Sequence, residues 1–283
     1  MTPTALTLVL VSAALHAYWN SLVKSAQDKA AFTWLYLLCS SALALPVAVV
    51  TLCEGVTARG WTFAVCSGLL YAMYFVSASV MYEHGELSVA YPIARGVAPA
   101  LSIVWAVLFL HEQVSLLGVL GVALIVVAIF ALAPAIRVGE ANSFRAIRAA
   151  LFTGLLTSIY ANTDKLGTLE IGPLRFVCLC YVLSFAFYSA FASAAIRRAR
   201  LSAELQRARW RPLTVGALSL GSYWLLLIAV LTSNVSYVVP LRSTAILFGV
   251  ALGTTTLGET RSAGKWVCAV LMLTGAALIA LRG

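Results

Sequence analysis

The stretch that decides the fold is YPIARGVAP, Tyr91 to Pro99, which places Arg95 between two prolines. It lies in a run from Leu87 to Leu110 that has no other charged side chain and is long enough to cross a bilayer as a helix. A lipid-facing charge costs about 2.5 to 3.5 kcal/mol on insertion scales, so an ionisable group at this depth indicates a functional site. The sequence therefore predicts a membrane helix whose arginine faces the protein interior.

The rest of the chain is as apolar as this stretch. Its 283 residues have a mean hydropathy of +0.96 and only 10% are charged, against roughly 25% in ordinary soluble domains. We predict an all-α integral membrane protein with about ten transmembrane helices in the lipid bilayer, the first retained and not removed as a signal peptide. The predicted spans are Pro3 to Lys24, Ala30 to Cys53, Trp61 to Tyr82, Leu87 to Leu110, Val114 to Pro134, Arg145 to Asp164, Ile171 to Ile196, Pro212 to Leu231, Ser236 to Leu257 and Ala263 to Leu281.

The opening pattern occurs a second time in the other half of the chain. AYPIARGVAPALSIVWAVLFLHE (90–112) and SYVVPLRSTAILFGVALGTTTLGE (236–259) each place an arginine early in an apolar helix and a glutamate just past its end. Arg95 and Glu112 have the same spacing as Arg242 and Glu259. An odd number of helices in each half reverses the second half in the membrane, so we predict two inverted five-helix repeats, residues 1–136 and 145–283.

Inverted repeats are a recurrent architecture of secondary transporters, which bind substrate near the midplane between the repeats. Arg95 and Arg242 approach the midplane from opposite faces, and a guanidinium offers a planar fork suited to carboxylate or phosphonate oxygens. Alternatively, each arginine satisfies carbonyls freed at the prolines or pairs with an internal acid. Asp164 is the only acid within a predicted span, and it is either a partner of Arg242 or an interfacial aspartate beside Lys165.

Two predicted helices carry polar side chains at helical spacing. Such stripes should face the bundle interior or a water-filled cavity, because lipid offers no hydrogen-bond partners. His16 within the first stripe either relays protons or, as a neutral imidazole, joins helices by hydrogen bonds. The two stripes are Ser12, His16, Asn20 and Lys24, and Thr153, Thr157, Tyr160 and Asp164.

Aromatic side chains lie in the middle of two further spans and not only in the interfacial belts where they are usual. Tyr71, Tyr74, Tyr223 and Trp224 are therefore candidates for the walls of a substrate cavity, with ordinary helix packing as the alternative. Glu112 and Glu259 at helix ends are assigned to stabilising turns. The predicted substrate-binding residues are His16, Asn20, Tyr71, Tyr74, Arg95, Tyr160, Asp164, Tyr223 and Arg242.

Charge and cysteine content exclude several other classes. The formal charge of +9 is concentrated in loops, mainly IRRARLSAELQRARWR at 196–211, where it sets membrane orientation and does not indicate nucleic-acid binding. Six cysteines are scattered through apolar segments without a CxxC motif, so we predict no metal site, no disulfide and no cofactor. A nucleotide-binding P-loop is also absent, which argues against direct drive by ATP.

Four motifs are together similar to a known family: HAYWN at 16–20, YPIARG at 91–96, YANTDKLG at 160–167 and VPLRSTAILFG at 239–249. They resemble a bacterial subset of the EamA branch of the drug/metabolite transporter superfamily, over essentially the whole chain. The resemblance implies a ten-helix carrier that moves small metabolites across the bacterial inner membrane by alternating access, commonly as an exporter.

The resemblance and the charge distribution disagree on orientation. Characterised members of the family usually keep both termini in the cytoplasm, whereas Lys and Arg here cluster in the loops that follow the first, third, fifth, seventh and ninth predicted spans. By the positive-inside rule that distribution places both termini outside.

The predicted function is a secondary transporter for a small organic substrate, anionic or zwitterionic. An intramembrane lipid-modifying enzyme is a second class, since YEHGELS places His84 between Glu83 and Glu86. A passive channel or helper subunit is a third class, although the sequence shows no pattern that predicts a pore with rings of carbonyls or charges. The sequence leaves the coupling ion and the oligomeric state open, with a homo-oligomer as one option.

Overall fold

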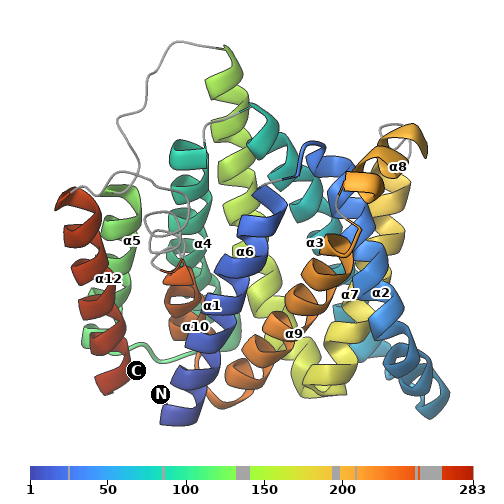
Figure 1. Cartoon of the computed structure of the whole chain (residues 1–283). Coiled ribbons are helices and arrows are strands. Elements are labelled where there is room, and N and C mark those ends of the chain that lie inside the picture. The colour runs from blue at the N-terminus through green and yellow to red at the C-terminus, as the bar shows by residue number, and fades with distance from the viewer. Residues whose placement is uncertain are drawn as a thin grey trace.

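The computed structural model describes residues 1–24, 26–84, 87–131, 141–192, 198–207, 209–245, 248 and 263–282, and no strand occurs among them (Figure 1). The regular elements of this part of the chain are all α-helices. They are α1 Pro3–Lys24, α2 Lys29–Glu54, α3 Ala58–His84, α4 Leu87–Leu110, α5 Leu116–Ala131, α6 Ala141–Ile171, α7 Pro173–Ala192, α8 Arg198–Arg207, α9 Arg211–Thr232, α10 Val235–Ser243 and α12 Ala263–Arg282.

The observed helices follow the predicted spans with two departures. Helix α8 lies in the arginine-rich segment that we expected to be a loop, which is reasonable because Arg, Leu, Ala, Glu and Gln all have high helix propensity. Helix α10 ends at Ser243, well before the predicted end at Leu257. Positions 246, 247 and 249–262 lie outside the described residues, and with them the predicted turn at Glu259.

Six helices of the described part are long and apolar enough to cross a bilayer by length and composition, namely α1, α2, α3, α4, α7 and α9. The apolar stretches in α5 and α12 are shorter, and polar residues such as Thr157 and Asn162 interrupt the apolar run of α6. Large hydrophobic side chains such as Leu108 and Phe109 are 59% and 68% exposed, as expected of a surface that faces lipid. The chain is thus a multi-pass membrane protein, as predicted.

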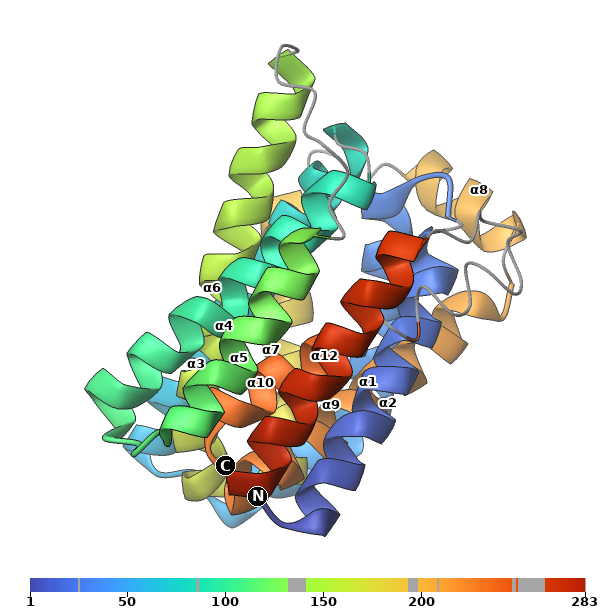
Figure 2. The same cartoon turned by 90° about the vertical axis from the view of Figure 1, so that its left-hand side faces the viewer.

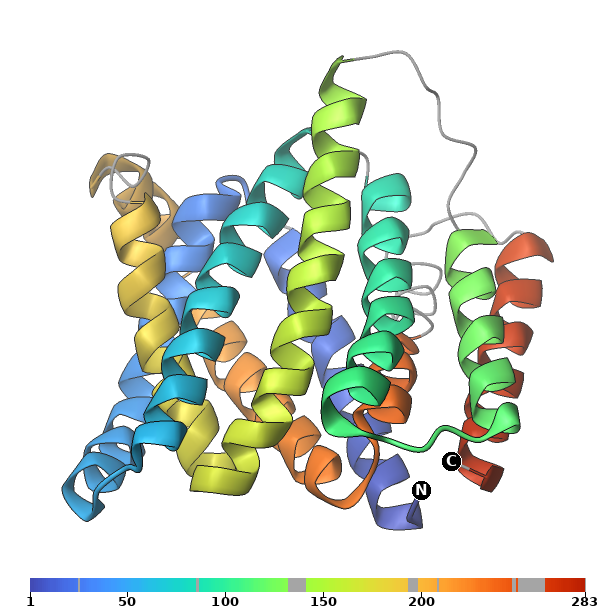
Figure 3. The same cartoon turned by 180° about the vertical axis from the view of Figure 1, so that it is seen from behind.

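The helices pack in pairs that join segments far apart in the sequence. Helix α1 lies against α9, α3 against both α6 and α7, and α2 against both α7 and α9 (Figures 2 and 3). Helix α4 packs on α6, and the short α10 lies against α4 and α1. Side chains from α1, α3, α4, α6, α9 and α10 therefore meet inside the bundle.

Helices α5 and α12 form a pair at one edge of the bundle (Figures 1 and 3). Their contact depends on two glycines. A Cβ at Gly121 would lie 2.6 Å from the carbonyl oxygen of Gly275, and one at Gly275 would lie 2.5 Å from that of Gly121. Small residues allow membrane helices to approach this closely, because van der Waals packing replaces the hydrophobic effect between helices in lipid.

Candidate functional site

Asp164 lies at the centre of the bundle, where it is 1% exposed. Its carboxylate accepts three hydroxyl hydrogen bonds: from Ser67 to Oδ1 at 2.6 Å, from Tyr71 to Oδ2 at 2.5 Å, and from Tyr223 to Oδ2. The acid belongs to α6, while the donors belong to α3 and α9. A buried carboxylate requires such partners because its desolvation is otherwise very costly. Asp164 is therefore an internal acid of the bundle, and its depth in the membrane stays a prediction.

Tyrosine rings surround this carboxylate. The ring of Tyr71 meets those of Tyr160 and Tyr223 edge-on, with centroids 4.9 and 5.5 Å apart. Tyr74 meets Tyr160 in the same manner at 5.9 Å, and Tyr71 also contacts Tyr181 of α7 at 6.4 Å. The four tyrosines predicted from the sequence are thus brought together, with one further tyrosine that the sequence did not single out.

Arg242, in α10, lies over the ring of Tyr223, with its guanidinium carbon 4.8 Å from the ring centroid. It is 8% exposed, and its Nε has no hydrogen-bond partner among the described residues. Within the described part of the chain, no ion pair joins Arg242 to Asp164. The direct pair offered as one sequence interpretation is absent, and Tyr223 instead contacts both charged residues.

Arg95 and His16 form a second buried polar contact, between α4 and α1. The Arg95 guanidinium hydrogen-bonds to Nε2 of His16, and the two residues are 9% and 3% exposed. A guanidinium has donors and no acceptor, so this imidazole nitrogen must be the acceptor and the ring must be neutral. Asn20 donates to the backbone carbonyl of His16 at 2.7 Å. This geometry agrees with the sequence interpretation of His16 as a neutral residue that joins helices.

Members of both predicted polar stripes face the bundle interior, while the side chain of Lys24 lies outside the described part of the chain. Ser12 and His16 are buried on α1, and the Ser12 hydroxyl donates to the Ser222 carbonyl of α9 at 2.6 Å. On α6, Thr153, Thr157, Tyr160 and Asp164 are each less than one-tenth exposed. Trp224, by contrast, is 36% exposed, and its assignment to a cavity wall stays a prediction.

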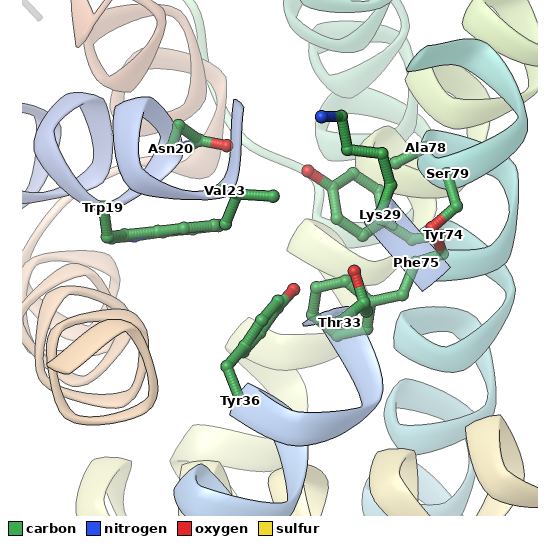
Figure 4. A pocket seen from close by; sticks show the side chains of 10 residues that line it. All are labelled: Trp19, Asn20, Val23, Lys29, Thr33, Tyr36, Tyr74, Phe75, Ala78 and Ser79. Carbon is green, nitrogen blue, oxygen red and sulfur yellow. Dashed lines mark hydrogen bonds between the residues drawn. The ribbon is translucent and has the colours of Figure 1, made fainter. Parts of the chain in front are cut away.

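A pocket lies between α1, α2 and α3, beside the buried cluster (Figure 4). Figure 4 shows Lys29 reaching across it, with the hydroxyls of Thr33 and Tyr36 below. The lining residues are Trp19, Asn20, Val23, Lys29, Thr33, Tyr36, Tyr74, Phe75, Ala78 and Ser79. Only Asn20 and Tyr74 were predicted from the sequence, although Trp19 stands inside the HAYWN motif.

Two aromatic contacts connect the pocket to the cluster. The ring of Trp19 lies edge-on to His16 at 4.8 Å, and Tyr74 contacts Tyr160. Trp19 is 6% exposed, and its indole nitrogen has no hydrogen-bond partner. A molecule in the pocket would therefore be separated from His16 by the ring of Trp19, and from the tyrosines around Asp164 by the ring of Tyr74.

The pocket end of the bundle has a set of contacts that we name the Asp28 clasp: Asp28, Arg200 and Glu204 with the backbone of the α1–α2 turn. Arg200 pairs with Asp28, and Glu204 accepts the backbone N–H groups of Gln27 at 3.1 Å and Asp28 at 2.8 Å. Burial raises the pKa of Asp28, but the hydrogen bond from Arg200 and that from the Ala31 backbone bring it below its ordinary value.

The opposite end, where both termini lie (Figure 1), is held by the Glu112 clasp: Glu112, Lys165 and the first residues of α10. Glu112 forms an ion pair of 2.8 Å with Lys165 and accepts the backbone N–H groups of Val235 and Ser236. Burial raises the pKa of Glu112, but these donors and the Ser236 hydroxyl bring it below its ordinary value. These contacts agree with the predicted stabilising role of Glu112, and the partners come from the other half of the chain.

The described residues hold no group of three His, Cys, Asp or Glu side chains that would bind a metal ion. The six cysteines are all free thiols. What the site offers is two buried guanidinium groups, one carboxylate that accepts three hydroxyls, a neutral imidazole and several tyrosine rings. Groups of this kind can bind and orient a small polar molecule.

The second half of the chain matches a known protein family. Residues 144–281 match the model of the EamA-like transporter family. The match begins in α6 and ends in α12, so the EamA-like domain includes Asp164, Tyr223 and Arg242. The EamA-like family consists of membrane transporters of small substrates. It is the family that the sequence motifs resembled, although those motifs and the bacterial subset remain predictions.

The fold as a whole has a counterpart among solved structures. A structure described as "Crystal structure of protein" covers 98% of this chain and 95% of its own, with a TM-score of 0.74 and 14% identity. At that identity the likeness shows the fold alone. A search of curated proteins found no match.

Proposed function

We propose that the chain is a secondary transporter that moves a small organic metabolite, anionic or zwitterionic, by alternating access in the direction of export across the bacterial inner membrane. The observation that carries the proposal is the buried cluster of Arg95, His16, Asp164 and Arg242 beside a pocket. The helices that supply it come from both halves of the chain. Such a site near the midplane between repeats is the arrangement that alternating-access carriers use.

The pattern of helix contacts supports the proposal of two inverted repeats, residues 1–136 and 145–283. If the repeats are exchanged, α1 corresponds to α6, α3 to α9, and α2 to α7. The contact of α3 with α6 then corresponds to that of α9 with α1, and α3 on α7 corresponds to α9 on α2. The exchange leaves two contacts unchanged, because α2 and α7 are related to each other and so are α5 and α12. A bundle built from one repeated unit would have this symmetry.

The pocket supports an inward-facing state. It lies at the end of the bundle where α2 begins, beside the arginine-rich α8, and the termini lie at the other end (Figure 1). By the positive-inside rule, the α8 end faces the cytoplasm and the termini face outward. A cytoplasmic pocket beside the cluster is what an exporter requires in order to take up its substrate.

The enzyme alternative gains no support from His84. Its Nδ1 lies 3.1 Å from the carbonyl of Val80 in its own helix, and Glu83 is exposed, while Glu86 lies outside the described residues. The matching family is one of transporters. We therefore propose that the chain moves its substrate chemically unchanged.

Flux measurements in proteoliposomes test this function. Arg95→Ala or Arg242→Ala should abolish saturable counterflow of organic anions, because each removes a buried guanidinium from the cluster, while the protein still inserts and elutes as a monodisperse particle. Arg175→Ala is the matched control, since Arg175 pairs with Glu54 on the surface and its side chain is 49% exposed. Unchanged counterflow in both cluster variants would exclude the arginines from transport.

A further inference from the structure

We propose that Arg242 is the residue that binds an oxyanion group of the substrate, and that Tyr223 is the positioning residue that keeps Arg242 available for it. The inference rests on the proposed transport function and selects, of the buried arginines Arg95 and Arg242, the one that contacts the substrate. It also gives the bound group a chemical class, a carboxylate or a phosphate, whose oxygens match the paired donors of a guanidinium.

Tyr223 lies between Asp164 and Arg242. Its hydroxyl donates to Oδ2 of Asp164, and the guanidinium carbon of Arg242 lies over its ring, 4.8 Å from the centroid. Within the described part of the chain, no ion pair joins the acid to the arginine. Such a pair would engage the guanidinium donors with an internal carboxylate. Tyr223 therefore separates Arg242 from the acid that would otherwise compete with a ligand.

Arg242 has hydrogen-bonding capacity that the described residues do not use. Its side chain is buried, and its Nε has no partner among these residues. The ring of Tyr223 attracts the charge of the guanidinium, but a ring face offers no lone pair to an N–H group. A buried donor without an acceptor costs free energy that an incoming oxygen would recover. An oxyanion supplies such oxygens together with the opposite charge.

Arg95 is engaged in a different way. Its guanidinium donates to Nε2 of His16, and this contact joins α4 to α1. An oxyanion at Arg95 would have to compete with the imidazole for the same donors. We therefore assign Arg95 to holding these two helices together, and Arg242 to the ligand.

The ring of Tyr223 is itself held in place. It is 6% exposed and meets the ring of Tyr71 edge-on, with centroids 5.5 Å apart. Ser67 and Tyr71, both of α3, donate to the same carboxylate of Asp164 that accepts from Tyr223. A support fixed by several helices restricts the long side chain of Arg242, and a restricted side chain loses less conformational entropy when a ligand binds.

Tyr71 provides a matched control for Tyr223. Both tyrosines are buried, and both donate a hydroxyl hydrogen bond to Oδ2 of Asp164. Arg242 lies over the ring of Tyr223, and in the described part of the chain it makes no such contact with Tyr71. Truncation of either residue removes one hydroxyl from the carboxylate, and only truncation of Tyr223 removes the support of Arg242.

The experiment measures the thermal unfolding of the purified full chain in detergent with acetate or methyl phosphate, against chloride at the same ionic strength. A ligand that binds the folded form raises the unfolding temperature by mass action. We expect at least one of the two anions to stabilise the wild type, and the stronger one identifies the class of oxyanion. Arg242→Gln should abolish the shift, and Arg242→Lys should restore part of it because the charge returns without the planar fork.

The role of Tyr223 is tested with the same anion. Tyr223→Leu should weaken binding by about tenfold, which lies in the range of a desolvated cation–π contact, and Tyr223→Phe should restore most of the affinity because the ring returns. Tyr71→Leu should lower the unfolding temperature without ligand but bind the anion like the wild type. A purely structural role of Tyr223 would give the two Leu variants the same affinity.

If a Leu variant fails to fold, Tyr223→Phe and Tyr71→Phe replace the pair. Only Tyr223→Phe should then weaken binding, because only Tyr223 connects Asp164 to Arg242. The inference is overturned if neither anion raises the unfolding temperature, if Arg242→Gln binds the anion like the wild type, or if the Tyr223 and Tyr71 variants have equal affinity.

Failure of transport is distinguishable from failure of this inference. Binding of the anion that depends on Arg242, without counterflow in proteoliposomes, would refute the carrier and leave the assignment of Arg242 and Tyr223 in place. Saturable counterflow that persists unchanged in Arg242→Gln would overturn the assignment and leave the carrier in place.

Discussion

The Glu112 clasp and the Asp28 clasp, at opposite ends of the bundle, differ in how deeply their side chains are buried. The Glu112 clasp is buried, with Glu112 and Lys165 side chains 5% and 18% exposed, and it ties the α4–α5 connection to α6 and α10. The Asp28 clasp is more open, since the Arg200 side chain is 43% exposed. Salt bridges at the surface contribute little to stability, whereas loss of a buried partner leaves an unpaired charge. We therefore expect the termini end to be sealed and the pocket end to be the one that admits a ligand.

The two ends of the bundle should differ most in chemical labelling from the two sides of the membrane. Ser79 lines the pocket, so Ser79→Cys in a chain without its six native cysteines should react with a membrane-impermeant maleimide added on the α8 side. The same reagent on the termini side should give almost no product. Equal labelling from both sides would contradict a seal at the Glu112 clasp.

Removal of Glu112 should give the largest loss of stability. Glu112→Ala leaves Lys165 and the N–H groups of Val235 and Ser236 without their acceptor, so we expect a loss of about 2 to 4 kcal/mol in the free energy of unfolding. Thermal unfolding in detergent measures it, and Ser79→Cys labelling from the termini side should increase in this background. Glu170→Gln is the control, because its partner Arg59 has a side chain that is 77% exposed. Equal effects of the two substitutions would show that the Glu112 clasp is no stronger than a surface pair.

The contribution of the Glu112 charge should disappear in acid. The folded-state pKa of Glu112 lies below its ordinary value of 4.5, so the unfolded chain binds the proton more readily. Its stabilising effect is complete above pH 4.5 and is lost as the pH falls through the lower folded-state pKa. The difference in unfolding temperature between the wild type and Glu112→Gln should therefore narrow below that value, and a difference that stays constant into acid would contradict this assignment.

A substitution in the Asp28 clasp should have the smallest effect on the free energy of unfolding. Arg200→Ala should change the free energy of unfolding by about 1 kcal/mol or less, because solvent and salt screen an exposed pair. Added salt should reduce this difference further, while the effect of Glu112→Ala should persist. A loss from Arg200→Ala as large as that from Glu112→Ala would show that both ends are sealed alike.

Sequence patterns predicted which face of a helix lies inward better than they predicted which residues of other helices that face contacts. The polar stripes of α1 and α6 were expected to face inward, and Thr153 and Ser12 do so. The place of Trp224 stays open, because an aromatic residue in the middle of an apolar helix fits both a cavity wall and the lipid face. The pocket was largely missed, since Lys29 and Thr33 stand near a helix end where polar residues need no special explanation.

The sequence by itself determined that the chain crosses a membrane and predicted that Arg95 and Arg242 belong inside it, because charge is expensive in lipid wherever the helices pack. Only the tertiary structure decided which groups meet: Asp164 with Tyr71 and Tyr223 rather than with Arg242, and Arg95 with His16. The physical reason is that helical periodicity fixes the direction of a side chain from its own helix axis. The partner it meets depends on the rotation and depth of helices that lie far away in the sequence.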